Sequence, residues 1–217
     1  MAVAYKTKIE QRTLAGKTFV LETIEDLDDA IMLLCESLGE HPNPFAEDLC
    51  PYYGVLWPSG EGLAQAVAAR AQELKGKRIV EVGCGLGFPS LLAQHLGANV
   101  LATDFHPDVV NFLARNGRHN SLEVPFKRFN WRDPADAVGQ FEIVMGSDVL
   151  YEPKHPGDVA AGFQRLLAPG GEVWLADPGR GYLQRFVDEM EKAGFNHSLE
   201  PQTVGEIEIY FFRFTKN

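Results

Sequence analysis

A glycine-rich turn is the strongest chemical signal in the sequence. Glu81-Val82-Gly83-Cys84-Gly85-Leu86-Gly87 follows a short apolar segment, 78–82, and precedes a segment opened by Pro89. A strand, a glycine turn and a helix in this order are typical of a nucleotide site, because glycine lets the backbone turn sharply and approach a ligand without a Cβ atom. A tight strand-to-helix turn without a ligand is the alternative explanation.

The spacing of these glycines separates two kinds of nucleotide site. A dinucleotide site usually has the pattern G-x-G-x-x-G, whereas here the third glycine comes one residue earlier and Glu81 stands two residues before the first. An acidic residue two positions before G-x-G-x-G resembles the first motif of class I methyltransferases. That resemblance implies S-adenosylmethionine as the cofactor, bound at Gly83, Cys84, Gly85 and Gly87, with Glu81 near its cationic end.

Other candidate cofactor residues lie beside neighbouring strands or before the sheet. Asp104 ends the next predicted strand, where nucleotide-binding α/β folds place a carboxylate that accepts hydrogen bonds from ribose hydroxyls; its alternative role is to cap the helix opened by Pro107. Asn130 and Trp131 are placed to flank an adenine ring, or else to form a cap and a core side chain. Trp57 is expected to close over the cofactor or to pack on the helix before the sheet.

Several segments together resemble methyltransferase family 16, whose members include protein-lysine methyltransferases and carry an Asp-x-x-Tyr motif after the fourth strand. The resemblance covers roughly residues 50–195 and rests on Gly54–Gly60, the glycine turn, Asp104 and Ser147-Asp148-Val149-Leu150-Tyr151. Within that family, the lysine methyltransferases of the electron-transfer-flavoprotein β subunit are most similar, on the segments Pro51-Tyr52-Tyr53, Trp57-Pro58, Asp148–Tyr151 and Asp177-Pro178-Gly179-Arg180.

The resemblance implies an amine as the methyl acceptor. Asp148 is then expected to accept a hydrogen bond from the amine, Tyr151 to shape the channel, and Asp177, at the end of the fifth strand, to act as a second acceptor. Ser147 is assigned to the cofactor site. A carboxylate that caps the following turn and a half-buried tyrosine are the alternative explanation of the same motif. Arg180 is expected to pair with Asp177 or with a substrate carboxylate, or to be an exposed turn residue.

Three other functions are alternatives to a protein-lysine methyltransferase. An enzyme for a small amine or pyridine, such as nicotinamide, predicts a closed pocket over Asp148 instead of an open channel. A nicotinamide-dependent oxidoreductase is disfavoured by the glycine spacing. A non-catalytic S-adenosylmethionine-binding module is disfavoured by Asp148 and Tyr151 beside an intact turn, although fold alone does not guarantee function.

Composition narrows the classes of partner. The 217 residues carry a formal net charge of −10 with 45% hydrophobic and 23% charged residues, and an acidic chain argues against a nucleic-acid partner. The three cysteines form no C-x-x-C pair and the six histidines no metal spacing, so we expect no disulfide framework and no metal. The sequence shows no signal peptide or membrane-span pattern, which favours a cytoplasmic location. The oligomeric state is not predicted.

Apolar periodicity predicts the elements that position these residues. It indicates a hairpin over 5–9 and 18–23 with Ala15-Gly16 at the turn, a helix over 27–38 and a loop over 40–58. A helix capped by Ser59 is expected to run to about Lys75. Strands at 78–82, 99–103, 126–129, 141–146 and 172–176 then alternate with helices at 89–96, 107–116, 159–167 and 183–190. Pro169-Gly170-Gly171 is expected to end the third of these helices.

This alternation, with the family resemblance, predicts an α/β fold. We expect a Rossmann-like seven-stranded sheet with helices on both faces and ligands at the carboxyl ends of its strands. Two strand-like runs, 195–200 and 205–215, are joined by Pro-Gln-Thr-Val alone, too short for a parallel crossover, which predicts an antiparallel end to the sheet. The chain is divided into a hairpin-and-helix arm on the substrate side, 1–50, and an S-adenosylmethionine-binding domain, 51–217.

Overall fold

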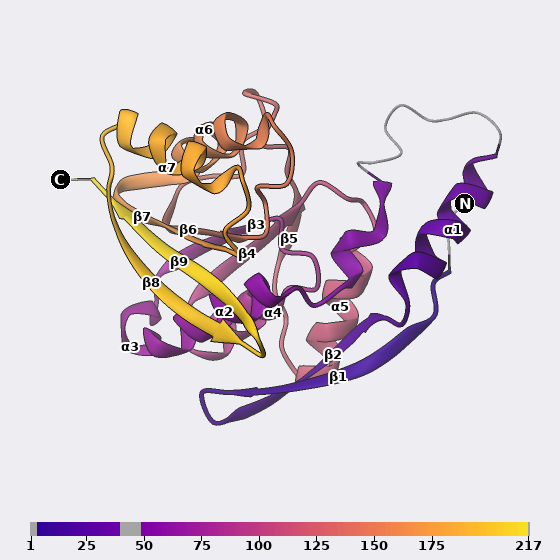
Figure 1. Ribbon diagram of the computed structural model, residues 1–217. Coiled ribbons are helices and arrows are strands. Elements are labelled where there is room, and N and C mark those ends of the chain that lie inside the picture. The colour runs from indigo at the N-terminus through magenta and orange to yellow at the C-terminus, as the bar shows by residue number, and fades with distance from the viewer. Residues whose placement is uncertain (1–3, 40–48, 217) are drawn as a thin grey trace.

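A seven-stranded sheet forms the centre of the computed structural model, which describes residues 4–39 and 49–216 (Figure 1). The strand order is β5-β4-β3-β6-β7-β9-β8. The first five of these strands run parallel to one another, whereas β9 runs antiparallel to both β7 and β8. The predicted seven-stranded Rossmann-like sheet with an antiparallel end is therefore confirmed.

The parallel strands begin and end close to their predicted positions. They are β3 (Arg78–Val82), β4 (Asn99–Asp104), β5 (Phe126–Arg128), β6 (Phe141–Ser147) and β7 (Leu167–Asp177). The exception is the start of β7, which includes Pro169-Gly170-Gly171 instead of following it. Leu167 already pairs with Phe141 of β6, and the register shifts between Phe141 and Ile143 to absorb the irregular segment.

Alternate residues of the sheet pack into two separate apolar layers. In β3, Ile79 packs with α2 (Pro58–Ala69) and α4 (Phe88–His95), whereas Val80 packs with α6 (His155–Leu166) and α7 (Leu183–Lys192). Successive side chains of a strand point to opposite faces, so one strand supplies both layers. Figure 1 shows α6 and α7 above the sheet and α2 and α4 below it. Helices cover both faces, as predicted.

The last two strands form a long hairpin at one edge of the sheet. β8 (Asn196–Val204) pairs with β9 (Ile207–Thr215) along its whole length. The turn is Gly205-Glu206, with Gly205 at a φ of 61°, so the segment 201–204 lies within β8 and the predicted position of the connection is wrong. Glycine adopts this left-handed conformation without a Cβ clash, which places the turn there.

The amino-terminal hairpin packs on the main body. β1 (Thr7–Leu14) and β2 (Lys17–Ile24) pair around the predicted turn, and α1 (Leu27–Leu38) follows, with the Asp26 side chain accepting a hydrogen bond from the Asp29 N–H at 3.0 Å. Phe19 and Leu21 are fully buried in the layer that contains α2 and α4. The hairpin thus shares the core of the sheet, and the division of the chain at residue 50 stays a prediction. Residues 40–48 of the predicted loop lie outside the described residues.

The helix before the sheet differs from its prediction at both ends. It begins at Pro58 with Trp57 as N-cap, and Ser59 is fully buried without a capping hydrogen bond. Proline at the first helical position needs no N–H partner, which explains a start without a side-chain cap. The helix breaks at Arg70 and resumes as the single turn α3 (Ala71–Leu74). The four-residue 3-10 helix η2 (Pro51–Gly54) lies in the remainder of the predicted loop.

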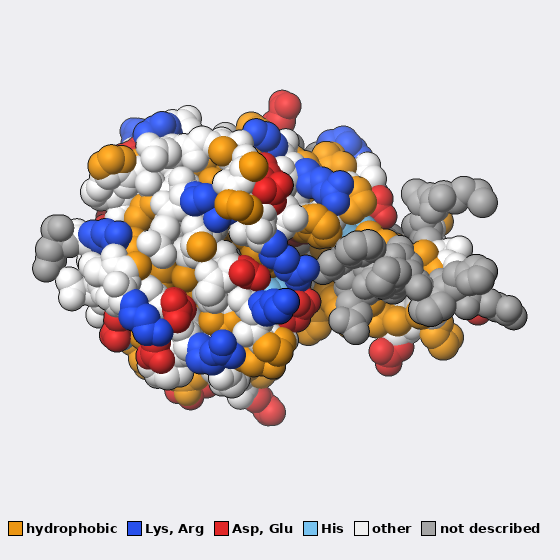
Figure 2. Space-filling view, turned by 90° about the horizontal axis from the view of Figure 1, so that it is seen from above, with side chains coloured by type: hydrophobic (Ala, Val, Ile, Leu, Met, Phe, Trp, Pro, Cys, Tyr) orange, Lys and Arg blue, Asp and Glu red, His pale blue; other side chains and the backbone are white. Residues whose placement is uncertain are grey.

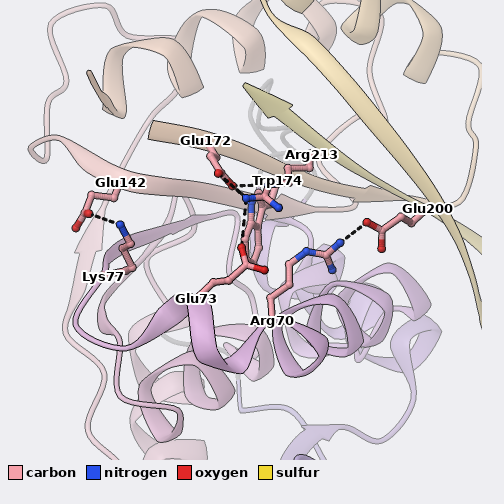
Figure 3. Close-up of polar contacts among 8 residues, drawn as sticks. All are labelled: Arg70, Glu73, Lys77, Glu142, Glu172, Trp174, Glu200 and Arg213. Atoms are coloured by element: carbon pink, nitrogen blue, oxygen red, sulfur yellow. Dashed lines mark hydrogen bonds and ion pairs between the residues drawn. The ribbon is translucent and has the colours of Figure 1, made fainter. Parts of the chain in front are cut away.

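Ion pairs at the amino ends of the strands tie α2 and α3 to the sheet (Figure 3). Arg213 of β9 bonds to Glu172 of β7 at 2.6 Å and to Glu73 of α3 at 3.2 Å, and the Trp174 indole N–H donates to Glu172 at 2.9 Å. Arg70 pairs with Glu200 of β8. These contacts lie at the opposite end of the strands from the glycine turn, so they support the scaffold and not the candidate site.

The surface carries mixed charge on the face shown in Figure 2, where Lys and Arg side chains (blue) are interspersed with Asp and Glu (red). Nucleic-acid binding relies on clustered cations, and the exclusion of such a partner stays a prediction. In the described parts of the chain, the helices are too short or too polar to cross a bilayer.

Candidate active site

A cavity of about 360 Å³ opens at the carboxyl ends of β3, β4 and β6. All but two of the residues predicted for the site line it. The lining residues among them are Trp57, Glu81, Gly83, Cys84, Gly85, Asp104, Asn130, Trp131, Ser147, Asp148 and Tyr151. Gly87 and Asp177 are absent from the described lining. The folding of a parallel sheet thus brings together residues that are far apart in the sequence, at the edge where such sheets bind ligands.

The glycine turn has a backbone conformation and a close packing that require glycine. Gly83 and Gly85 have φ values of 70° and 49°, in the left-handed region that favours glycine. A Cβ atom at Gly85 would lie 3.0 Å from the carbonyl oxygen of Tyr53, and one at Gly83 would lie 2.8 Å from Val149. The turn can therefore pack closely against η2 and the segment after β6 only with glycine at these positions.

Gly87 has a packing role, and its predicted cofactor contact stays a prediction. It is the N-cap of α4 with a φ of 76°, and a Cβ atom there would collide with the Leu113 side chain of α5 (Val109–Asn120). The glycine lets α5 approach the start of α4.

Glu81 lies at the end of β3 and is buried. Its Oε2 accepts hydrogen bonds from the backbone N–H of Ser90, at 3.0 Å, and from the Ser90 hydroxyl. Burial raises the pKa of Glu81 to about 8, with a smaller contribution from the neighbouring Asp104, whereas the bonds from Ser90 act in the opposite direction. A buried carboxylate on a cavity wall favours either a proton or a cationic ligand group.

Asp104 joins the end of β4 to the glycine turn. Its Oδ2 accepts the Gly85 N–H at 3.0 Å and its Oδ1 accepts the His106 N–H at 2.9 Å. Burial raises the pKa of Asp104, against these backbone hydrogen bonds. The alternative role as a helix cap is not observed, because α5 begins at Val109 with Asp108 as N-cap. A carboxylate has lone pairs for further donors, so the bonds leave capacity for a ligand hydroxyl.

The tryptophans border the cavity and also make local contacts. The Trp57 indole N–H donates to the Tyr52 carbonyl at 2.9 Å. Trp131 is 8% exposed and packs edge-on against the His155 ring, with centroids 5.4 Å apart. The Asn130 side chain accepts the Arg132 N–H at 3.0 Å within a turn, and no helix begins there for it to cap. These side chains therefore both line the cavity and make structural contacts.

Asp148 has an unusual backbone and a cationic partner. Its φ is 60°, a conformation uncommon outside glycine and associated with functional sites. Its carboxylate pairs with the guanidinium of Arg180, which also lines the cavity. Three residues later, Tyr151 is 50% exposed and its ring packs edge-on against His155, with centroids 4.5 Å apart. The motif therefore presents a carboxylate and a phenol ring at the cavity mouth.

Asp177 lies at the end of β7, where it holds the turn that follows. It is fully buried, and its Oδ1 accepts the backbone N–H groups of Gly179, at 2.8 Å, and Arg180, at 2.9 Å. Burial raises its pKa. One oxygen of the carboxylate thus folds the turn after β7 and positions Arg180, and the role of Asp177 as a second acceptor stays a prediction.

Three residues of this region were not singled out by the sequence. Ser90 holds Glu81; Asn116 of α5 donates to the Leu86 carbonyl at 3.1 Å and accepts the Glu22 N–H of β2 at 2.7 Å; His155 packs between Trp131 and Tyr151. Apart from Tyr151, which is four residues from His155, the partners lie in other elements of the fold, so spacing alone carried no signal. Within the described residues no cluster of His, Cys, Asp or Glu forms a metal site.

Comparison with known proteins identifies the family. The family model described as a methyltransferase domain matches residues 60–207. The chain belongs to this methyltransferase family. Calmodulin-lysine N-methyltransferase of Arabidopsis thaliana is 28% identical over 155 residues, 66% of this chain and 51% of that protein. Electron transfer flavoprotein beta subunit lysine methyltransferase of Rattus norvegicus is 27% identical over 132 residues, 60% of this chain and 51% of that protein. The methyltransferase chain thus spans about half the length of these curated relatives.

The fold agrees with that of solved methyltransferases. Magnesium protoporphyrin IX methyltransferase of Synechocystis PCC 6803, crystallised with bound S-adenosylmethionine, matches with a TM-score of 0.59 at 16% identity, over 82% of this chain and 86% of that chain. The predictions of a class I methyltransferase and of S-adenosylmethionine as its cofactor are confirmed.

The cavity of this methyltransferase fits that cofactor. Two carboxylates, Glu81 and Asp104, suit a cationic group and ribose hydroxyls, and the indole rings of Trp57 and Trp131 also line the cavity, which suits an aromatic base. Gly83 and Gly85, both at positive φ, have no side chains, so the backbone itself forms that wall.

Proposed function

We propose that this protein transfers a methyl group from S-adenosylmethionine to an amine, and that the acceptor is a lysine side chain of a protein. The observation that carries the proposal is that Asp148 and Tyr151 line the same cavity as Glu81, Gly85 and Asp104. The cofactor-binding and acceptor-binding residues are then side by side, as transfer between two bound groups requires.

In this proposal the two ends of the cavity have different tasks. Glu81, Gly83, Gly85 and Asp104 hold the cofactor, which supplies a methyl group bound to a sulfonium sulfur; Trp57, Cys84, Asn130, Trp131 and Ser147 complete the same wall. Asp148 accepts a hydrogen bond from the acceptor amine and orients its lone pair toward the methyl group. A lysine ammonium has a pKa of about 10.4 in water and must lose a proton to the solvent before it attacks. Burial near the cavity mouth favours the neutral amine.

An exposed rim supports a macromolecular acceptor. The Tyr151 side chain is 50% exposed and that of Arg180 is 35% exposed, so a lysine side chain can reach Asp148 from outside while its backbone stays on the surface. Two relatives are named for lysine acceptors in proteins, which agrees with this assignment. We also assign residues 1–50 to the substrate side, and we place the protein in the cytoplasm, in keeping with its three free cysteines.

A small-molecule amine, including a nicotinamide-like pyridine, is the second candidate. It is favoured by the limited exposure of Asp148 itself, whose side chain is only 11% accessible. A small acceptor could be enclosed at that depth. A non-catalytic S-adenosylmethionine-binding module is the third candidate, and it differs from both in predicting no transfer.

Transfer of labelled methyl groups separates these candidates. The protein is incubated with S-adenosylmethionine labelled on the methyl group and a cell lysate, which is then divided into protein and small-molecule fractions. We expect label in the protein fraction on lysine, lost with Asp148→Asn and kept with Glu206→Gln, which removes a carboxylate from the exposed β8–β9 turn. Label confined to small molecules would favour the second candidate. Binding of the cofactor without label in either fraction would refute the enzyme.

A further inference from the structure

The guanidinium of Arg180 lies at the cavity mouth, although the proposed acceptor, a lysine, is itself a cation in water. Asp148 and Arg180 form an ion pair, and both side chains line the cavity. They come from the ends of neighbouring strands, because Ser147 of β6 pairs with Ala176 of β7. The acceptor carboxylate is therefore already occupied by a guanidinium in the structure.

The backbones on both sides of this ion pair are fixed. The Asp148 N–H donates to the Ala176 carbonyl at 3.1 Å. The Arg180 N–H and the Gly179 N–H both donate to the buried Asp177 carboxylate, and Gly179 has a φ of 85° with the Tyr210 ring against its Cα. An amine that takes the Asp148 oxygen now paired with Arg180 displaces the guanidinium, and it does so by rotation of the Arg180 side chain, since the backbone around it is held.

Displacement leaves the Arg180 guanidinium in need of a new partner. Its side chain is about one-third exposed, and burial lowers its pKa, so its charge is only partly solvated where it lies. A partly buried charge that loses its counter-ion costs free energy unless another anion replaces it. The carboxylate of Glu152 already has a partner, because Arg132 of the cavity lining contacts both Glu152 and His155 at 3.1 Å. The carboxylate of the cofactor and a carboxylate on the acceptor are the remaining sources of an anion, and of these only the acceptor's can distinguish one acceptor from another.

We infer that Arg180 is a specificity-determining residue that favours acceptor amines with an adjacent carboxylate over amines without one. In the substrate complex the amine takes Asp148, and the guanidinium of Arg180 turns to the acceptor's carboxylate. The anion is an acidic side chain next to the target lysine or the carboxylate of a small amino acid. The inference rests on the proposed function in assigning Asp148 to the amine.

Matched pairs of acceptors test this inference. One pair is two short peptides that differ only in Glu or Gln on each side of a single lysine, and the other is 4-aminobutyrate and butylamine. Wild type, Arg180→Gln, Arg180→Lys and Arg185→Gln are compared by initial rates of labelled methyl transfer. Binding of each acceptor is also measured by calorimetry, with the protein loaded with S-adenosylhomocysteine. Arg185 is an exposed residue of α7, so its variant is a control for the loss of one positive charge.

The ratio within each pair is the deciding quantity. We expect the carboxylate-bearing member of at least one pair to be preferred about 10-fold in wild type and in Arg185→Gln, the size of one charge-assisted hydrogen bond. The preference should fall to about 1 in Arg180→Gln, and Arg180→Lys should keep part of it. Equal use and equal binding in wild type would overturn the inference, as would a preference that survives Arg180→Gln.

The binding ratio distinguishes failure of this inference from failure of the proposed function. Preferential binding of the carboxylate-bearing member, lost in Arg180→Gln, supports the role of Arg180 even where no label is transferred. Transfer to both peptides at equal rates, with no preference in the 4-aminobutyrate and butylamine pair either, supports a lysine methyltransferase and rejects the role of Arg180.

Discussion

The Asp104 carboxylate accepts the backbone N–H of Gly85 at 3.0 Å, so the end of β4 holds the glycine turn that follows β3. The same side chain lines the cavity. Asp104 therefore combines a structural bond to the turn with free lone pairs toward the ligand, and the two roles predict different responses to substitution.

Replacing Asp104 should weaken cofactor binding. Asp104→Ala removes the acceptor for the ribose hydroxyls and is expected to cost about 1.5–3 kcal/mol of binding free energy, the range for a hydrogen bond to a charged group. Asp104→Asn keeps a carbonyl oxygen for the Gly85 N–H and should lose less stability than Asp104→Ala. Calorimetric titration with S-adenosylmethionine and denaturant unfolding measure the two effects. Unchanged affinity with lower stability would leave the bond to the turn as the only role.

A side chain at Gly85 should disrupt the turn. Gly85→Ala places a Cβ atom 3.0 Å from the Tyr53 carbonyl in a left-handed backbone conformation, and Gly85→Val adds a branched side chain that should abolish cofactor binding. We expect Gly85→Ala to lose about 1–3 kcal/mol of stability. Gly157→Ala, a helical site with open space around its Cα, is the control and should be neutral or slightly stabilising. A Gly85→Val protein that binds the cofactor normally would contradict the assigned turn.

Asp148→Asn should reduce turnover and spare the cofactor. Asparagine tolerates the positive φ of 60° at this position, so the variant tests the charge without adding backbone strain. We expect kcat to fall about 100-fold or more with cofactor affinity nearly unchanged, because the proposed function assigns the carboxylate to the acceptor amine. Higher pH should partly restore the rate, since more of the amine is then neutral. The pH–rate profiles of wild type and variant decide this; near-normal turnover would make the motif structural.

Glu81 should make the cofactor-free protein less stable as the pH rises. Burial raises its pKa from 4.5 to about 8, so between these values the folded state holds a proton that the unfolded state has lost. The contribution is fully present below pH 4.5 and is lost as the pH rises through 8. The unfolding free energy of wild type relative to Glu81→Gln should fall by up to about 1.4 kcal/mol per pH unit in this window. Denaturant unfolding across the window measures it, with Glu206→Gln as the control. If the difference in unfolding free energy between wild type and Glu81→Gln did not change with pH, Glu81 would be ionised in the folded state.

Local sequence determined the framework of this protein. The apolar run of β3, the glycine spacing after it and the alternation of strands and helices depend on residues adjacent in the chain, so the sheet and the cofactor turn could be predicted with few errors of boundary. The carboxyl-end position of Asp104 and Asp148 then followed, because parallel strands bring their carboxyl ends to one edge.

The tertiary structure alone decided which charges meet at that edge. Asp177 and Asp148 both follow strands in the sequence, yet Asp177 is buried in its own turn whereas Asp148 lines the cavity and pairs with Arg180. Likewise, nothing in the spacing linked Ser90 to Glu81 or Asn116 to β2. Side-chain pairing depends on strand register, on how closely helices approach and on burial, which arise only when distant segments pack. A carboxylate that is buried by that packing accepts hydrogen bonds from whichever donors lie within reach.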